Sequence, residues 1–242
     1  MDAISNSAAR YARLREEEMS IDDYLALCQS DPMVYGSAAQ RMLAAIGEPE
    51  MVDTRNDPRL SRLFANKLIR RYPAFAEFYG MEDSIEQVVS FFRHAAQALE
   101  ERKQILYLLG PVGGGKSSIA ERLKYLVQKV PFYALKGSPV NESPLGLFDV
   151  AEDGPVLEEQ FGIPRRYLQH VLSPWAVKRL EEYGGDIRQF RVVKRYPSIL
   201  KQIAIAKTEP GDENNQDISS LVGKVDIRKL ENFAQDDTDA YS

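Results

Sequence analysis

The sequence predicts an α/β fold in which helices flank a parallel β-sheet. Three consecutive features in the middle of the chain support this. Residues 105–109 form an apolar run, which is typical of a strand covered on both faces. A glycine-rich turn follows at residues 110–115. Apolar residues then recur at helical spacing from Ile119 to Val127. We expect the rest of the chain to be arranged around this strand, turn and helix.

The glycine-rich turn matches the P-loop pattern, in which a glycine and four further residues precede Gly-Lys-Ser/Thr. Glycines let the backbone amides turn inward, and the positive end of the following helix favours a polyphosphate. Lys116 is therefore predicted to contact the β- and γ-phosphates as the catalytic residue, and the Ser117 hydroxyl to bind Mg²⁺. The predicted phosphate site consists of Gly110, Pro111, Val112, Gly113, Gly114, Gly115, Lys116, Ser117 and Ser118.

The chain before this unit is predicted to be mostly helical. Residues from about Ala8 to Met19 are rich in helix formers, Ser20 can cap a second helix, and Asp31 precedes another start signal at a proline. Gly47 fits the end of this helical region. Residues 48–72 carry a basic cluster that is expected to be a solvated face. Its members are Arg59, Arg62, Lys67, Arg70 and Arg71. We expect a helical region with a basic linker over 1–72 and a nucleotide-binding domain over 73–242.

A long amphipathic helix is predicted to follow Gly80, with apolar residues at helical spacing from Ile85 to Leu99, and to end in the charged stretch 100–103. His94 within it is expected to be an ordinary surface or core residue. Residues 130–135 and 190–193 have strand character. Prolines and glycines between them, through residue 155, suggest an exposed excursion. Further helices are expected to start at Pro164, Ser173, Ser198 and Asp226, and Gly184-Gly185 fits the end of the one from Ser173. Its expected core residues are Trp175, Val177 and Leu180.

Composition restricts the class of protein. Apolar residues make up 44% of the 242 residues and charged residues 28%, which is ordinary for a globular chain without a membrane span. The single cysteine, Cys28, excludes an internal disulfide, and we find no secretory signal, so we expect a cytoplasmic protein. Residues 209–242 carry nine acidic and three basic residues. Such an acidic segment repels nucleic-acid phosphate, so no nucleic-acid partner is expected.

A second acidic residue at the end of a neighbouring strand is normally needed to turn over ATP. Asp149, after Leu145-Gly146-Leu147-Phe148, is the nearest approach, but prolines and a glycine interrupt its surroundings. We therefore expect Asp149 to be a loop carboxylate. With few strands predicted after the P-loop, the parallel sheet is expected to be incomplete.

Several segments resemble the PrkA family of bacterial serine protein kinases. They are Phe78 to Gln87, the P-loop as Gly-Pro-Val-Gly-Gly-Gly-Lys-Ser-Ser, Met42 to Pro49, Ser173 to Ala176, and Ala206 to Asp217. The resemblance extends over almost the whole chain. It implies an AAA-type P-loop NTPase domain that binds ATP and Mg²⁺, acts on a protein substrate and is linked to stress, starvation or sporulation. Family members are longer, so the resemblance also implies an N-terminal portion, truncated before the second acidic motif and the arginine finger.

The resemblance further implies that Tyr79, Gly80 and Met81 border the adenine, and it is compatible with a homo-oligomer. The residues themselves do not show a eukaryotic-type kinase, whose His-Arg-Asp and Asp-Phe-Gly segments are absent. Three functions stay open: an ATP-binding domain of a PrkA-like kinase or ATPase, a small-molecule P-loop kinase, and a non-enzymatic nucleotide-responsive adaptor. A GTPase is disfavoured because no Asn-Lys-x-Asp follows the P-loop. Arg165 and Arg166 could serve as arginine fingers, although a surface ion pair is the simpler expectation.

Overall fold

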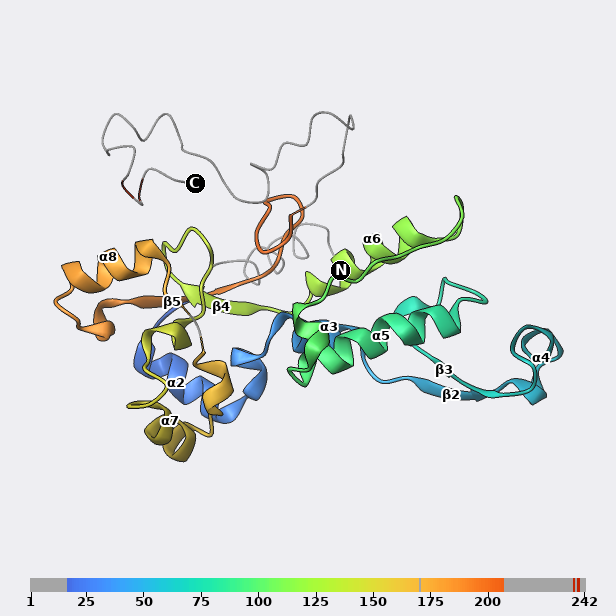
Figure 1. Ribbon diagram of the computed structural model, residues 1–242, viewed down its shortest axis with the longest axis horizontal. Coiled ribbons are helices and arrows are strands. Elements are labelled where there is room, and N and C mark those ends of the chain that lie inside the picture. The colour runs from blue at the N-terminus through green and yellow to red at the C-terminus, as the bar shows by residue number, and fades with distance from the viewer. Residues whose placement is uncertain (1–16, 170, 207–236, 238, 240–242) are drawn as a thin grey trace, which may run out of the picture. The chain divides into compact units, whose positions relative to one another are not determined.

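The computed structural model describes residues 17–169, 171–206, 237 and 239. The chain divides into two compact units (Figure 1). The sheet unit consists of residues 1–35 and 131–242, and the P-loop unit consists of residues 36–130. This division does not coincide with the boundary that the sequence suggests at residue 72.

The sheet unit contains a three-stranded antiparallel sheet in the order β1-β5-β4. Its strands are β1 (Glu17–Ser20), β5 (Arg191–Arg195) and β4 (Phe132–Leu135). Val193 of the central strand lies opposite Glu18 on one side and Ala134 on the other. Strands β4 and β5 confirm two sequence predictions. A third prediction is wrong: Glu17 to Met19 were expected to be helical, but they lie in strand β1. Pairing with β5 overrides their helix propensity.

Helices cover this sheet and share its apolar core. They are α2 (Ile21–Ser30), α7 (Gly154–Phe161) and α8 (Pro174–Glu182), and Figure 1 shows α2 and α7 side by side. The core includes Tyr24 of α2, Leu145, Leu157 of α7, Ala176 of α8 and Val192 of β5.

The helix signals of this unit have mixed outcomes. The Ser20 cap of α2 is confirmed by a capping box with Asp23, and the Ser173 cap of α8 is confirmed by a hydrogen bond from the Ala176 amide. The sequence predicts an exposed loop near residue 155, but the structure has helix α7 there. The buried side chain of Leu157 holds this helix against the core. Val177 is exposed rather than part of the core, where Ala176 lies instead.

The P-loop unit is built on three helices: α3 (Ala38–Ile46), α5 (Glu82–Ala96) and α6 (Lys116–Val127). Helix α3 packs against both α5 and α6, and the core between them includes Ile46, Ile85, Val89 and Leu126. Helix α3 ends at Ile46, and its C-cap is the predicted Gly47, whose φ of 79° is one that glycine adopts readily. Helix α5 ends at Ala96, earlier than the sequence predicts.

A β-hairpin joins these helices in the P-loop unit. Strand β2 (Glu50–Asp53) pairs antiparallel with β3 (Leu68–Arg71), and α4 (Pro58–Phe64) lies in the connection between them (Figure 1). Three of the predicted basic residues are held by acidic neighbours: Lys67 by Asp83, Arg70 by Glu86 and Arg71 by Glu50.

Glu86 of α5 fastens the hairpin to the helices. Its carboxylate accepts hydrogen bonds from Arg70 Nη1 at 2.6 Å, Tyr72 Oη at 2.6 Å and Arg93 Nη1 at 3.4 Å. Burial by itself would raise the pKa of Glu86, but these three donors outweigh it and hold the pKa below its ordinary value. The charged form of Glu86 is therefore part of the folded state.

The predicted parallel sheet is not found in the part of the chain that the structure describes, where each strand pair is antiparallel. Residues 105–109 run without a regular element. Leu106 and Leu108 pack against the helices, whereas Ile105, Tyr107 and Leu109 are 90%, 78% and 84% exposed. The apolar run therefore has one covered face, and no described strand pairs with it. A fully apolar run predicts a strand whose two faces are both covered by other elements. The run itself does not contain the element that would cover its second face.

Other predictions also differ from the structure. Residues Ser198 to Ile203 form a turn closed by a bridge rather than a helix, and the signal at Asp31 leads only to a 3₁₀ turn, Pro32–Tyr35. The helices expected over residues 8–16 and from Asp226 lie outside the described residues. No helix among the described residues is long and apolar enough to cross a membrane.

Candidate nucleotide site

The turn before α6 adopts its shape because glycine occupies the positions that need it. Gly115 is the N-cap of α6 and has a left-handed backbone, with φ of 76°. A Cβ at this position would lie 3.0 Å from Met81 Sδ and 3.1 Å from Met81 Cε. Gly113 is also left-handed, with φ of 79°, but has open space around it. Side chains rarely adopt this backbone, so the sequence favours the tight curl.

Lys116 folds back over this curl. Its ammonium donates hydrogen bonds to the Gly110 carbonyl at 2.8 Å and to the Pro111 carbonyl at 2.5 Å. The Gly114 amide also donates to the Pro111 carbonyl, at 3.2 Å. The ammonium is thus held by carbonyl oxygens of the loop itself, which are weaker acceptors than the oxygens of a phosphate.

The first turn of α6 offers amide donors. The first backbone hydrogen bond of the helix runs from the Ile119 amide to the Gly115 carbonyl at 2.9 Å. Within the described residues, the structure gives no acceptor to the amides of Lys116, Ser117 and Ser118. Free amides at a helix N-terminus, together with the helix dipole and an adjacent ammonium, favour an anion.

An open cavity of about 630 Å³ lies beside these amides. It is lined by Gly115, Ser117 and Ser118 of the P-loop and by Glu77, Phe78, Glu121 and Arg122. Its volume is in the range of small-molecule and cofactor sites. The cavity therefore connects the anion-favouring helix end to an aromatic side chain.

Arg122 fixes one wall of this cavity. Its Nε donates to the Ala74 carbonyl at 2.6 Å and lies 3.3 Å from Glu77 Oε1. The guanidinium also lies 5.3 Å from the Tyr125 ring centre. Phe78 packs against Phe75, with ring centres 5.9 Å apart. These contacts position the segment before α5 against α6.

A smaller cavity of about 210 Å³ lies where the P-loop meets residues 106–109. Lys116, Gly114 and Met81 line it together with Ser84 and Gln87 of α5. Met81 thus borders this cavity and also touches the Gly115 backbone position.

The residues predicted from the sequence fall into two groups in the structure. Gly115, Lys116, Ser117 and Ser118 meet at the start of α6, and Gly110, Pro111 and Gly114 close around Lys116. Val112 is fully exposed at the outer side of the turn. Tyr79 is 88% exposed, and neither Tyr79 nor Gly80 is among the residues that line the two cavities.

Sequence reasoning missed Glu77, Phe78 and Arg122 as cavity residues. Phe78 belongs to a segment that resembles the PrkA family, but the resemblance implies contact with the base only for Tyr79, Gly80 and Met81. Arg122 gave no signal, because its role depends on a contact with Ala74 that lies 48 positions earlier.

No group of three or more metal-binding side chains occurs among the described residues. The Ser117 hydroxyl is exposed in the same cavity as the free amides, which fits a Mg²⁺ ion held jointly by this hydroxyl and by nucleotide phosphates. Mg²⁺ usually binds through few protein ligands of this kind.

The other acidic and basic candidates have local partners. Asp149 accepts hydrogen bonds from the Ala151 and Glu152 amides, which confirms a loop carboxylate. Arg165 forms the expected ion pair with Glu158 at 3.2 Å, and Arg166 lies 5.1 Å from the Tyr167 ring centre instead.

Comparison with known proteins supports the resemblance. The family description "PrkA AAA domain" matches residues 19–242. The chain is 64% identical over 245 aligned positions to "Serine/threonine kinase YeaG" of Escherichia coli strain K12, covering 100% of this chain and 38% of that protein. It is 33% identical to "ATP-dependent protease PrkA" of Bacillus subtilis strain 168, covering 95% of this chain and 36% of that protein.

These relatives are considerably longer than the chain, which spans less than two fifths of each. No solved structure matches it significantly. The family match over nearly the whole chain, with the P-loop geometry above, leads to one conclusion: the chain belongs to the PrkA AAA domain family.

Proposed function

We propose that the chain binds Mg-ATP at the start of α6. The observation that carries this proposal is the coincidence of three free amides, the Lys116 ammonium and the Ser117 hydroxyl beside one open cavity. The β- and γ-phosphates take the place of the Gly110 and Pro111 carbonyls as acceptors for Lys116. Charge-assisted hydrogen bonds to phosphate are roughly twice as strong as those to neutral carbonyls, which supports the exchange.

The base occupies the end of the open cavity that Phe78 lines. The aromatic ring offers a face or edge for a planar base, and the pair of Arg122 and Glu77 offers polar groups at the same wall. Tyr79 and Gly80 border the base only if the exposed Tyr79 side chain moves toward it. Bound Mg²⁺ would neutralise phosphate charge, and Ser117 would hold it on the protein side.

The reaction that follows ATP binding is phosphoryl transfer to a protein hydroxyl or to water, in stress or starvation signalling. The relatives' names support an ATP-dependent enzyme but divide between kinase and protease. Among the described residues, Asp149 is occupied in its own loop. The two carboxylates that line the open cavity, Glu77 and Glu121, are paired with Arg122 and Lys124. We therefore propose that the 242-residue chain binds Mg-ATP and turns it over slowly. We also propose that other residues of the whole protein complete the site and pair with residues 105–109 in a sheet.

A small-molecule kinase receives no support from the structure beyond the P-loop. A nucleotide-responsive adaptor remains the alternative for the chain, and it is favoured by the same shortage of a second acid. The two functions share the binding step, so that step is the first to test.

The test is calorimetric titration of Mg-ATP into the chain and into Lys116→Ala. A hydrogen bond to a charged group contributes about 1.5–3 kcal/mol, so Lys116→Ala should weaken binding roughly ten- to hundred-fold. Lys67→Ala is the matched control, because Lys67 lies in the same unit, pairs with Asp83 and lines neither cavity. Its affinity should equal that of the unaltered chain.

A second arm tests the metal. Ser117→Ala should reduce the gain in ATP affinity that added Mg²⁺ produces, while leaving binding without Mg²⁺ unchanged. Equal affinity for Mg-ATP in the unaltered chain and in Lys116→Ala would refute the proposal.

A further inference from the structure

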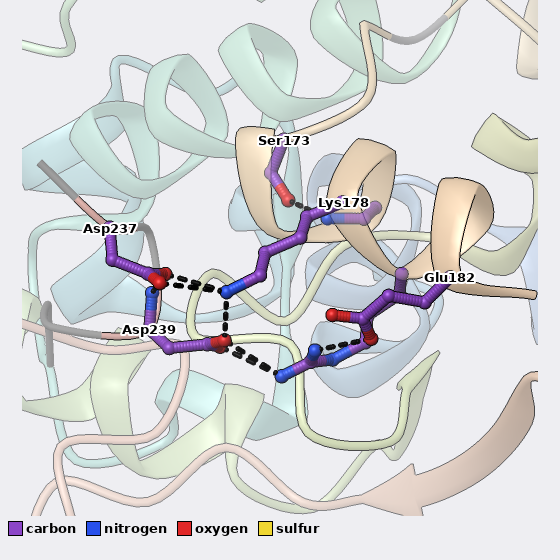
Figure 2. Close-up of polar contacts among 7 residues, drawn as sticks. Ser173, Lys178, Glu182, Asp237 and Asp239 are labelled. Carbon is purple, nitrogen blue, oxygen red and sulfur yellow. Dashed lines mark hydrogen bonds and ion pairs between the residues drawn. The ribbon is translucent and has the colours of Figure 1, made fainter. Parts of the chain in front are cut away.

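Two adjacent cations on helix α8 hold two carboxylates from a distant part of the chain (Figure 2). Lys178 Nζ donates to Asp237 Oδ1 at 2.7 Å and to Asp239 Oδ2 at 2.8 Å. Arg179 Nη2 donates to both oxygens of Asp239 at 2.9 Å. Asp239 is therefore shared by both cations, and Lys178 is shared by both aspartates.

The network has internal supports on both sides. On the helix, Glu182 Oε2 accepts from Arg179 Nη1 at 2.6 Å, and the guanidinium lies 5.7 Å from the Trp175 ring centre. On the acidic segment, the Asp239 amide donates to Asp237 Oδ1 at 2.9 Å, which sets the two carboxylates side by side. Each side of the network therefore has a supporting contact of its own.

Among the ion pairs of the described residues, Asp239 is the most buried carboxylate. The Asp239 side chain is only 11% exposed, whereas most carboxylates in the remaining pairs are more than twice as exposed. Exposed ion pairs contribute little to stability, but a network of partly buried charges contributes more. The acceptors of this network also come from the stretch of the chain with nine acidic and three basic residues.

We propose that α8 carries a docking site for an acidic peptide with two aspartates two positions apart, and that Asp237 and Asp239 are its occupant in this chain. Lys178 and Arg179, the α8 cation pair, supply the specificity, because each contacts the second aspartate and only Lys178 contacts the first. Another segment with this spacing of carboxylates competes for the same site. The proposal does not depend on nucleotide binding.

Trp175 provides a direct signal for occupancy. It is the only tryptophan of the chain, and its ring lies against the guanidinium that binds Asp239. In the Asp237→Asn, Asp239→Asn variant the site loses its charged occupant, so Trp175 emission should shift. Glu18→Gln is the matched control, because it removes the 2.6 Å ion pair with Lys136 in the same unit and should leave the emission unchanged.

The probe is a synthetic peptide with the sequence of residues 233–242. It should bind the Asp237→Asn, Asp239→Asn variant and restore the original Trp175 emission. It should bind the unaltered chain at least ten-fold more weakly, because that site is occupied. High salt should weaken binding several-fold, since the contacts are between charges. Adding Lys178→Gln and Arg179→Gln to the variant should abolish binding.

Two results would overturn the proposal. One is an unchanged Trp175 emission in the Asp237→Asn, Asp239→Asn variant together with no peptide binding. The other is equal peptide affinity for the variant and the unaltered chain, which would show that Asp237 and Asp239 do not occupy the site. If circular dichroism shows that the neutral variants are unfolded, a charge-swapped variant replaces them. Lys178→Asp, Arg179→Asp alone and Asp237→Lys, Asp239→Lys alone should each lose the original fold and Trp175 emission, and the combination of all four substitutions should restore both.

Discussion

The close approach of Met81 to Gly115 lets us predict how much a substitution at Gly115 lowers the free energy of unfolding. In Gly115→Ala, the new methyl group would lie 3.0 Å from Met81 Sδ on a backbone with φ of 76°. The left-handed backbone costs a side chain about 1–2 kcal/mol. Moving Met81 out of its rotamer costs about 0.5–1.5 kcal/mol more. We therefore expect Gly115→Ala to lower the free energy of unfolding by roughly 1.5–3.5 kcal/mol.

Gly113→Ala is the matched control for the backbone part. Gly113 has nearly the same φ, 79°, but no atom lies within 4 Å of its added methyl group. Its expected cost is the backbone strain alone, about 1–2 kcal/mol. The difference between the two variants isolates the contact with Met81.

Urea unfolding followed by far-ultraviolet circular dichroism measures both costs, and a double-mutant cycle with Met81→Ala measures their coupling. The shortened side chain at position 81 leaves room for the methyl group that Gly115→Ala adds, so the loss in the double variant should be smaller than the sum by about 0.5 kcal/mol or more. Mg-ATP affinity should fall in Gly115→Ala and recover partly in the double variant. Strict additivity, with equal costs for the two glycine variants, would refute the packing argument.

Three further predictions concern stability. The donors around Glu86 lower its pKa in the folded state, so Glu86 contributes to the free energy of unfolding above the ordinary pKa of 4.5. This contribution is lost as the pH falls through the folded-state pKa. The free energy of unfolding, measured across this acidic range, should therefore depend less on pH in Glu86→Gln. Leu106→Ala should cost about 1–2 kcal/mol in urea unfolding and Ile105→Ala less than about 0.5, because only Leu106 packs against the helices; equal costs would contradict one-sided packing. Ser173→Ala should destabilise the sheet unit by about 1 kcal/mol through the lost cap of α8, measured by Trp175 emission during unfolding, and Ser173→Asn should retain most of that stability.

Local signals predicted the elements that depend on local chemistry. The caps at Ser20 and Ser173 and the glycine at position 47 fix helix ends through contacts within a few residues, so the sequence contains the necessary information. Strand β1 and helix α7 were missed because long-range contacts decide them: pairing with β5 in one case and burial of Leu157 in the other.

The candidate site shows the same division. The P-loop residues could be predicted because glycines, lysine and serine at fixed spacing specify a local curl. The cavity wall made by Arg122 and Glu77 could not be predicted, because it arises from packing between segments more than forty positions apart in the sequence. The parallel sheet was predicted from an apolar run whose outer face has no described strand beside it.

The most direct test of the account is amide hydrogen exchange at residues 113–118 with and without nucleotide. Our account predicts that Mg-ATP slows exchange at the Lys116, Ser117 and Ser118 amides, which have no acceptor among the described residues, and that Mg-AMP slows it much less because it lacks the β- and γ-phosphates. Unchanged exchange at these three amides with saturating Mg-ATP would contradict the proposal that they bind phosphate.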